Sequence, residues 1–352
     1  MSLVLALPSK GSLYDGTLAL FGRCGMAVQR DGRGRGYWGK LKHVDNVKVQ
    51  FLRAEEIPLR VDAGDVALGL TGFDLYKESC HGSERSCVLI RSLGFGHARL
   101  VVAVPKVWID TQDMHDLAEV AREIRQKTGR GLRVGTKFPR AVRQFFAEHS
   151  IRDYAIVDSL GATEGMPASG AADVVVDLTS SGSTLAENDL KEIAGGTVIE
   201  SEASLLASSQ PAIWTEENLA LLTRIVECLE AGLRAEKRHL IHFTVVAERL
   251  PKLLRELTVE CHCEAGGETV GREPLDNAAE TVRAGEAVHG GVPGSLPIRS
   301  SVVCPTASVY QAYRVLRRAG ATGVSVLSPN LMFAENSEAV AGFERLLKRH
   351  DA

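Results

Sequence analysis

The chain contains no apolar run long enough to cross a membrane. Its longest apolar stretches, such as residues 100–104, fall far short of the roughly 20 residues that a transmembrane helix needs. The N-terminus, MSLVLALPSKG, also has no basic segment of the kind that opens a secretory signal, and it is better explained as a first strand. We therefore expect a cytoplasmic protein with no membrane partner.

Net charge is also small, since 44 acidic residues nearly balance 41 basic ones and the formal charge is -3. This balance gives no general attraction to nucleic acid, so we expect no nucleic-acid partner. With 352 residues, of which 45% are hydrophobic, the composition excludes disorder and allows two or three domains.

Cysteine pairs at characteristic spacings are missing as well. The seven cysteines are odd in number and scattered, unlike the disulfide framework of a small secreted domain. Cys261, His262 and Cys263 are adjacent, which does not match the C-x₂-C spacing of a structural zinc site. We expect reduced thiols and no zinc at this position.

The most informative segment that is present spans residues 172–190, ADVVVDLTSSGSTLAENDL. Three valines flanked by Asp173 and Asp177 predict a short buried strand with an acid at each end. Thr184 and Glu187 have the spacing of a capping box, which predicts a helix that begins there. Between strand and helix lies a run of small residues: Thr179, Ser180, Ser181, Gly182 and Ser183.

Such a run can hold a phosphate, because hydroxyls and backbone N–H groups gather at a helix N-terminus. An ordinary strand-to-helix turn uses the same residue types and binds nothing. The two carboxylates favour a ligand that carries sugar hydroxyls or Mg²⁺ beside the phosphate. A phosphorylated sugar satisfies both requirements.

Residues 1–214 alternate strand-like and helix-like patterns, which indicates α/β structure with a mostly parallel sheet. Two lobes are predicted, residues 1–98 together with about 197–214, and residues 99–196, with VIESEASLLAS as a strand that returns to the first lobe. Lys10 lies where the first strand passes to the first helix, which makes it either an anion contact or a solvated loop lysine.

One glycine-rich stretch stands apart from this pattern. Residues 30–40 read RDGRGRGYWGK, and their four glycines predict a basic loop without regular structure. Its arginines either close over a polyphosphate or remain solvated.

The last third of the chain changes character after a long amphipathic helix. Apolar residues spaced by three and four predict that helix from about residue 215 to 240, as a linker over 215–238. Strand, helix, strand, strand and helix patterns over residues 239–352 then suggest a ferredoxin-like α+β domain.

Taken together, a series of motifs resembles the ATP phosphoribosyltransferase family. The resemblance covers most of the first 210 residues and depends on several segments in the same order: LPSKGSLYDGTL, FLRAEEIP, DVALGLTGFDL, LGFGHARLVVAVP, RVGTKFPRAVRQFF and SLGATEGMPASGAADVVVDLTSSGSTLAENDLKEI. It implies a two-lobed catalytic core like that of the type II periplasmic binding proteins, with the active site in the interlobe cleft. It also implies a pentosyltransferase that moves the phosphoribosyl group of phosphoribosyl pyrophosphate to N1 of ATP with Mg²⁺, the first step of histidine biosynthesis.

The resemblance also implies roles for particular residues. The phosphoribosyl pyrophosphate site would comprise Thr179, Ser180, Ser181, Gly182, Ser183 and Thr184. Asp173 and Asp177 would face the ribose hydroxyls or hold Mg²⁺, and Glu164 matches a further catalytic acid of the family. ATP or the pyrophosphate would be contacted by Lys10, Gly11, Arg53, Gly72 and Thr136. No nucleophilic triad is required, because displacement at an anomeric carbon needs positioning and charge stabilisation.

Long members of this family carry an ACT-like regulatory domain that binds histidine, and KRHLIHFTVVAERL and CPTASVYQAYRVLRRAGATGVSVLSPNLMF resemble it. The chain departs from the family in an insertion at about residues 262–296, in Phe138 where tyrosine is usual, and in Ser12 where arginine is frequent. The insertion puts the histidine pocket in doubt. The family habit suggests a homo-hexamer or a dimer.

The alternative hypothesis is a non-catalytic ligand-binding or regulatory protein on the same two-lobed fold. The lack of a signal-peptide pattern argues against a periplasmic binding protein, and the intact LTSSGSTL loop argues against an inactive relative of the enzyme.

Overall fold

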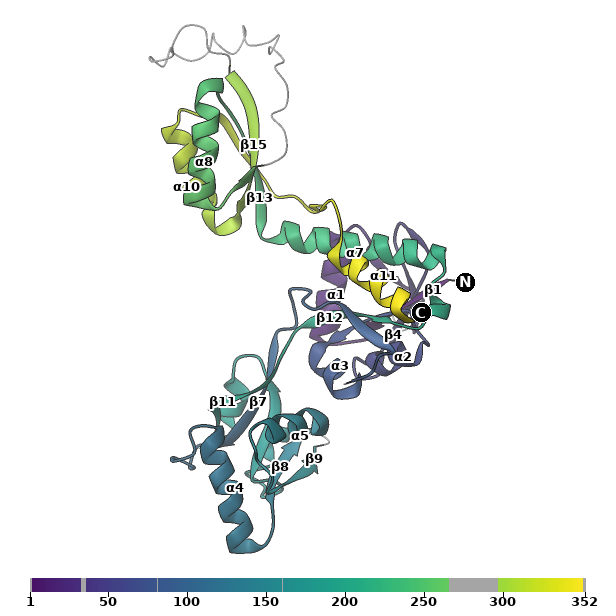
Figure 1. The fold of residues 1–352 in the computed structure, drawn as a ribbon, viewed down its shortest axis with the longest axis vertical. Helices are drawn as coiled ribbons and strands as arrows, with labels where there is room; N and C mark the ends of the chain where they lie inside the picture. Colours follow the sequence, from purple (N-terminus) through teal and green to yellow (C-terminus); the bar gives the residue numbers. More distant parts are fainter. Residues whose placement is uncertain (1, 33–35, 81, 160, 266–296, 351–352) are drawn as a thin grey trace. The chain divides into compact units, whose positions relative to one another are not determined.

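A computed structural model describes residues 2–350, apart from residues 33–35, 81, 160 and 266–296 (Figure 1). It divides the chain into two compact units. Unit 1 comprises residues 1–229 and 336–352, and unit 2 comprises residues 230–335. None of the helices in the described part of the chain combines the length and the apolar character of a membrane span.

The first lobe of unit 1 is built on a seven-stranded sheet in the order β2-β3-β4-β1-β5-β12-β6. Its strands are β1 (Leu3–Pro8), β2 (Val28–Arg30), β3 (Trp38–Leu41), β4 (Val44–Leu52), β5 (Leu68–Gly72), β6 (Ser86–Ile90) and β12 (Ala203–Ser208). Its helices are α1 (Ser12–Arg23), α2 (Ile57–Ala63) and α3 (Phe73–Cys80). The central strand β1 is parallel to both β4 and β5, so the carboxyl ends of these strands share one edge of the sheet.

The second lobe is a five-stranded sheet in the order β11-β7-β10-β8-β9. Its strands are β7 (Ala98–Pro105), β8 (Leu132–Thr136), β9 (Tyr154–Asp158), β10 (Val174–Thr179) and β11 (Leu190–Ser201), and its helical elements are α4 (Met114–Thr128), α5 (Pro139–Glu148), η1 (Thr163–Gly165) and α6 (Ser183–Glu187). Helices α4 and α5 bury apolar residues such as Leu117 and Phe146 against Val134 of the sheet. Burial of one such side chain contributes about 1.5–3 kcal/mol, so this core fixes the positions of the loops at the strand ends.

Two chain segments join the lobes, one from β6 to β7 and one from β11 to β12. Side chains hold the two segments together, since the Ser92 hydroxyl donates to Glu202 and the His97 Nδ1 atom lies 3.0 Å from the same carboxylate. The predicted single strand VIESEASLLAS is therefore two strands, β11 and β12, and it does return the chain to the first sheet.

Unit 2 contains β13 (Arg238–Val246), η3 (Ala247–Arg249), α8 (Leu250–Cys261), β14 (Glu264–Ala265), β15 (Pro297–Pro305), η5 (Thr306–Ser308), α10 (Val309–Arg318) and β16 (Thr322–Leu327). The antiparallel strand order β14-β15-β13-β16 is that of a ferredoxin-like domain. Helices α8 and α10 cover one face of this sheet (Figure 1). The fold expected for this part of the chain is confirmed, while residues 266–296 of the predicted insertion lie outside the described residues.

Helix α7 (Glu216–Glu236) runs through the boundary between the units, and its apolar stripe is buried at Leu222, Val226 and Leu229. The C-terminal helix α11 (Glu338–His350) was expected to belong to a domain of residues 239–352. The structure groups it with unit 1 instead. The physical reason is apolar packing, in which Phe343 meets Trp214, after η2 (Pro211–Ile213), with ring centroids 5.0 Å apart.

Two local expectations were wrong. Helix α6 starts at Ser183 with Gly182 as its N-cap, and no side chain caps it, so Thr184 and Glu187 form no capping box. The glycine-rich stretch around residues 30–40 is not wholly irregular, because Arg30 of β2 pairs with Gly39 of β3. Hydrogen bonding along the edge of the first sheet overrides the weak strand propensity of glycine there.

Candidate functional site

A cavity of about 700 Å³ in unit 1 is lined by residues of both lobes, and we refer to it as the interlobe cavity. The first lobe contributes Ser12, Leu13, Ala54, Glu55, Gly72, Asp74, Leu75, Glu78 and Ser79. The second lobe and its connection contribute Gly96, His97, Ala98, Lys137, Phe138, Asp177, Leu178, Thr179 and Ser180. Several of these residues follow the carboxyl ends of β4, β5, β8 and β10, which is where open α/β sheets bind ligands.

Four of the predicted site residues line this cavity: Gly72, Asp177, Thr179 and Ser180. Gly72 is required by a close approach, because a Cβ atom there would lie 2.5 Å from an Asp74 carboxylate oxygen. The structure thus brings together a residue of β5 and residues of β10 that are about a hundred positions apart in the sequence.

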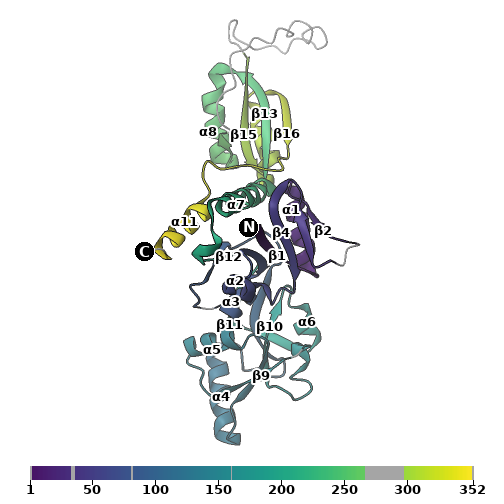
Figure 2. The ribbon, with the colours of Figure 1, turned by 90° about the vertical axis from the view of Figure 1, so that its right-hand side faces the viewer.

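The small residues after β10 form a tight loop. The Thr179 hydroxyl accepts a hydrogen bond from the Gly182 N–H at 2.8 Å, and the hydroxyls of Ser181 and Ser183 are 2.8 Å apart. Gly182 has a φ of 79°, in the left-handed region that favours glycine. Residues 181–184 continue from the rim of the cavity without lining it, and α6 lies beside β10 (Figure 2).

Asp177 is the carboxylate of β10 that faces the interlobe cavity. Burial raises its pKa, and the neighbouring charge of Glu164 raises it further, while a hydrogen bond from the Leu178 N–H and the charge of Lys137 act in the opposite direction. The charge of Glu164 thus adds to burial in disfavouring the ionised form of Asp177.

Glu164 belongs to the short helix η1 and does not line the cavity, but it influences Asp177 electrostatically. The family resemblance implies that Glu164 is a catalytic acid, and in the structure its charge acts on the Asp177 carboxylate.

Asp173, in contrast, is not part of this arrangement. It precedes β10 at the opposite end of the strand and is held by two arginines, with Arg130 Nη1 at 2.5 Å and Arg133 Nη2 at 2.8 Å from its oxygens. Although burial opposes ionisation, these hydrogen bonds hold the pKa of Asp173 well below its usual value. The expectation that Asp173 faces the ribose or Mg²⁺ together with Asp177 does not agree with the structure, because its carboxylate is already neutralised by guanidinium groups.

The remaining predicted contacts lie beside the cavity without lining it. Lys10, Gly11 and Arg53 are exposed, and each is adjacent in sequence to a lining residue or one position removed from it. Thr136 is fully buried at the end of β8, and its hydroxyl accepts a hydrogen bond from the Phe138 N–H at 3.0 Å. Thr136 therefore shapes the turn that presents Lys137 and Phe138.

Sequence reasoning missed Asp74, a carboxylate that lines the cavity and is 5% exposed. Burial raises its pKa, although hydrogen bonds, the strongest from the Ser201 hydroxyl, act in the opposite direction. The signal was available in the segment TGFD, where an acid follows the glycine that was chosen, but nothing local reveals Ser201 as its partner.

Glu78 was missed for a similar reason. Its carboxylate accepts hydrogen bonds from the backbone N–H groups of Arg140 and Ala141 at 2.9 and 3.0 Å. These amides lie at the N-terminus of α5, where a negative charge is favourable. Glu78 of α3 thus connects the first lobe to α5 of the second lobe at the wall of the cavity.

Among the residues that the structure describes, one cluster of three potential cation ligands occurs: Asp113, His115 and Asp116. Asp113 accepts hydrogen bonds from the backbone of both other residues at 2.8 and 3.0 Å, and together with Asp116 it forms the capping box of α4. These hydrogen bonds account for the cluster without a metal.

Comparisons with known sequences all indicate the same family. A family model described as ATP phosphoribosyltransferase matches residues 53–231. The ATP phosphoribosyltransferases of Afipia carboxidovorans and Rhodopseudomonas palustris are 37% and 36% identical to this chain, over 344 and 346 residues. That of Caulobacter vibrioides is 37% identical over 346 residues, and each comparison covers 98% of both sequences.

Among solved structures, an ATP phosphoribosyl transferase complex from Thermotoga maritima aligns with a TM-score of 0.48 at 20% identity, covering 65% of this chain and 96% of that chain. A periplasmic sulfonate-binding protein from Methylobacillus flagellatus aligns with a TM-score of 0.40 at 14% identity, covering 65% of this chain and 66% of that one.

Proposed function

The chain belongs to the ATP phosphoribosyltransferase family, and we propose that the interlobe cavity is the site of its reaction. The enzyme transfers the phosphoribosyl group of phosphoribosyl pyrophosphate to N1 of ATP and releases pyrophosphate, in the first step of histidine biosynthesis. The observation that carries the proposed location is the convergence of Asp177, Thr179 and Ser180 with Gly72 and Asp74 on one cavity.

The loop after β10 is proposed to bind the 5′-phosphate of phosphoribosyl pyrophosphate. Thr179 and Ser180 line the cavity, and the internal hydrogen bonds of residues 179–183 hold the loop in a fixed shape before a ligand arrives. A preorganised loop reduces the entropy that binding would otherwise lose. Ser181, Gly182, Ser183 and Thr184 continue this proposed site at the rim.

Asp177 is proposed to act on the ribose. Displacement at the anomeric carbon passes through a state with positive charge on the sugar ring, and a carboxylate close to that ring stabilises it. Adenine N1 is a neutral nucleophile, so the protein has to orient it and support the departing pyrophosphate. Lys137 is the cation among the lining residues that is placed for the second task.

The donor set fits Mg²⁺ at Asp177 with Glu164 nearby, because carboxylate oxygens are ligands that Mg²⁺ prefers and a cation would offset the effect of the Glu164 charge on Asp177. Asp173 does not fit, since two arginines already occupy its oxygens. When bound, Mg²⁺ would supply charge stabilisation for the pyrophosphate group. The protein's own contribution is to present Asp177 to the cavity, where a bound cation would favour its ionised form.

ATP is proposed to bind along the first lobe. Ser12 and Gly72 of this lobe line the cavity together with Phe138 of the second lobe, and Lys10, Gly11 and Arg53 lie at its edge. Because the family frequently has arginine at position 12 and tyrosine at position 138, this chain has fewer polar contacts available for the nucleotide at these two positions.

Regulation and assembly extend the proposal. Unit 2 is proposed to be an ACT-like domain that binds histidine as a feedback inhibitor, and the enzyme is proposed to act in the cytoplasm as a homo-hexamer or dimer. The ferredoxin-like strand order of unit 2 supports its assignment as an ACT-like domain. Titration calorimetry with histidine tests it, and an absence of heat up to millimolar histidine would contradict it.

A direct assay tests the location of the active site. The purified protein is incubated with ATP, phosphoribosyl pyrophosphate and Mg²⁺, and the absorbance change of the modified adenine ring is followed. We expect Asp177→Ala to abolish the change while the protein remains folded. Lys48→Gln, an exposed residue outside the cavity, serves as the control. Full activity of Asp177→Ala would place the reaction elsewhere.

A further inference from the structure

A second cavity of unit 1 has no part in the proposed reaction, and we refer to it as the α3–α5 cavity. Its volume is about 530 Å³. Its lining residues come from α3, α5, β11 and the end of β6: Phe73, Lys77, Arg91, Arg140, Ala141, Arg143, Gln144, Phe145, Glu148, Val198, Ile199 and Glu200. None of them lines the interlobe cavity.

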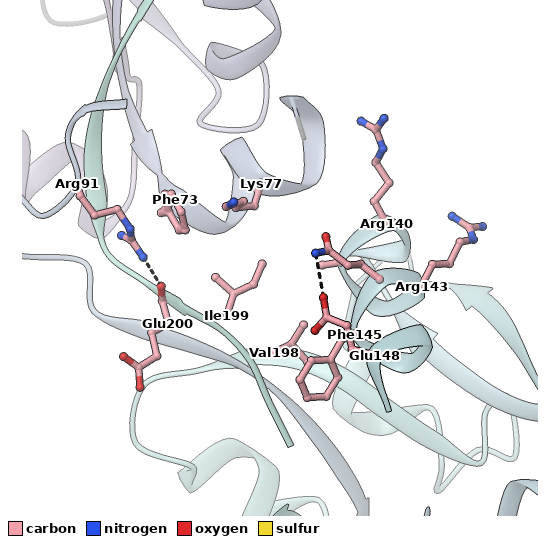
Figure 3. A pocket seen from close by; sticks show the side chains of 12 residues that line it. Phe73, Lys77, Arg91, Arg140, Arg143, Phe145, Glu148, Val198, Ile199 and Glu200 are labelled. Atoms are coloured by element: carbon pink, nitrogen blue, oxygen red, sulfur yellow. Dashed lines mark hydrogen bonds between the residues drawn. The ribbon is translucent and has the colours of Figure 1, made fainter. Parts of the chain in front are cut away.

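The middle of this cavity is apolar. Figure 3 shows Phe73, Ile199 and Val198 in a row between Arg91 at one end and α5, which carries Phe145, at the other. Two of these residues are aromatic, and such a surface favours a ligand with a flat or aliphatic body.

The rim of the cavity is cationic. Lys77, Arg91, Arg140 and Arg143 outnumber Glu148 and Glu200, so the lining carries a formal charge of +2. Glu148 accepts a hydrogen bond from Gln144 at 3.1 Å and is thereby held on α5. The excess positive charge favours an anionic ligand.

Lys77 and Arg91 are both held close to the apolar row. The Arg91 guanidinium carbon lies 3.3 Å from the centroid of the Phe73 ring, and the Lys77 ammonium lies 5.5 Å from it. Burial lowers the pKa of Arg91, although neighbouring carboxylates oppose this change. A partly desolvated cation gains more from an anionic partner than a solvated one does.

From these observations we propose that the α3–α5 cavity is an effector site for a small organic dianion with an aromatic or aliphatic body. A phosphate monoester of an apolar compound has this chemistry. The apolar body packs on Phe73, Ile199 and Phe145, and the dianion is bound by the cationic rim.

Helix α3 connects this site to the reaction. Phe73 and Lys77 line the α3–α5 cavity, whereas Asp74 and Glu78 of the same helix line the interlobe cavity. Glu78 in turn binds the N-terminus of α5, which forms the opposite wall of the α3–α5 cavity. A ligand between α3 and α5 therefore acts on the same two helices that Glu78 connects, and its binding should change the affinity for substrate.

Binding is tested by calorimetry with 1-naphthyl phosphate, on protein saturated with ATP and Mg²⁺ so that the proposed nucleotide part of the interlobe cavity is occupied. We expect one site per chain, no comparable binding of inorganic phosphate or 1-naphthol, and weaker binding at higher salt. The double variant Lys77→Gln, Arg143→Gln should bind roughly 10-fold more weakly, because it removes two cations that lie outside the reaction site. The matched double variant Lys48→Gln, Arg152→Gln removes one lysine and one arginine elsewhere and should bind as the wild type does.

The effector role is tested by steady-state kinetics with and without 1-naphthyl phosphate. We expect the compound to change KM for at least one substrate in the wild type and in the control variant, and to have no effect on the Lys77→Gln, Arg143→Gln variant, whose basal kcat is unchanged. Undiminished binding in that variant would overturn the site. Binding without any kinetic change would overturn its role as an effector site.

Discussion

Asp173 precedes β10 and Asp177 lies within it four residues later, and their replacement should have opposite consequences. Asp173→Asn should destabilise the protein and leave catalysis intact. Its carboxylate is 10% exposed and accepts hydrogen bonds from Arg130, from the Arg133 side chain and from the Arg133 backbone N–H at 2.9 Å. Breaking a buried pair costs about 3–5 kcal/mol, but the side chains of Arg130 and Arg133 are 43% and 34% exposed, so we expect about 2–3 kcal/mol.

This loss corresponds to a decrease in Tm of roughly 5–10 °C, measured by thermal unfolding. It should also depend on pH. The lowered pKa of Asp173 means that its stabilising contribution is present above the ordinary aspartate value of about 4 and is lost as the pH falls below that value. The difference in Tm between wild type and Asp173→Asn should therefore shrink in acid.

Asp177→Asn should show the reverse behaviour. Burial already disfavours the charged form of Asp177, so loss of the charge should leave Tm unchanged or slightly higher. Its kcat/KM should fall by about 100-fold or more if the carboxylate stabilises the transition state. The reasoning is refuted if Asp173→Asn loses activity at unchanged Tm, or if Asp177→Asn loses stability at unchanged kcat/KM.

Three further predictions concern the walls of the interlobe cavity. Phe138→Tyr and Ser12→Arg should each lower KM for ATP by roughly 2- to 10-fold, since each adds one polar contact. An unchanged KM in steady-state assays would argue against nucleotide binding at these two positions. Because the pKa of Asp177 is raised and its ionised form is the active one, log kcat/KM should begin to fall at a pH above the usual aspartate range as the pH is lowered. More Mg²⁺ should move this acidic side of the pH profile to lower pH. A pH profile that does not respond to Mg²⁺ would contradict binding of the ion by Asp177. Glu78→Gln removes the charge at the N-terminus of α5 and should lower the free energy of unfolding by about 0.5–1 kcal/mol while raising KM for both substrates. A denaturant titration and steady-state kinetics that both match wild type would show that this contact contributes to neither stability nor substrate binding.

Local sequence was sufficient for the strand, the loop and the order of elements. The valines of β10 and the hydroxyl residues after it predicted a strand that ends in a loop of small polar residues, because β-branched side chains and small polar residues have strong local preferences. The ferredoxin-like pattern of unit 2 was likewise readable from its alternation of strands and helices. The family itself followed from ordered motifs along the first 210 residues.

The sequence alone could not distinguish Asp173 from Asp177. Both flank the same valines, yet a strand of this length separates them by about 13 Å, so one end meets Arg130 and Arg133 and the other meets Glu164 and the cavity. Those partners are set by how β8 and η1 pack around β10.

The same reason explains what local patterns missed on α3. Asp74 accepts a hydrogen bond from Ser201, which is 127 positions away in the sequence, and Glu78 accepts one from the N-terminus of α5, which is 62 positions away. The sequence determined which positions have charged side chains, hydroxyl groups or glycine. Tertiary packing decided which of them are desolvated, which are neutralised and which face a cavity, because burial and ion pairing depend on groups that are distant along the chain.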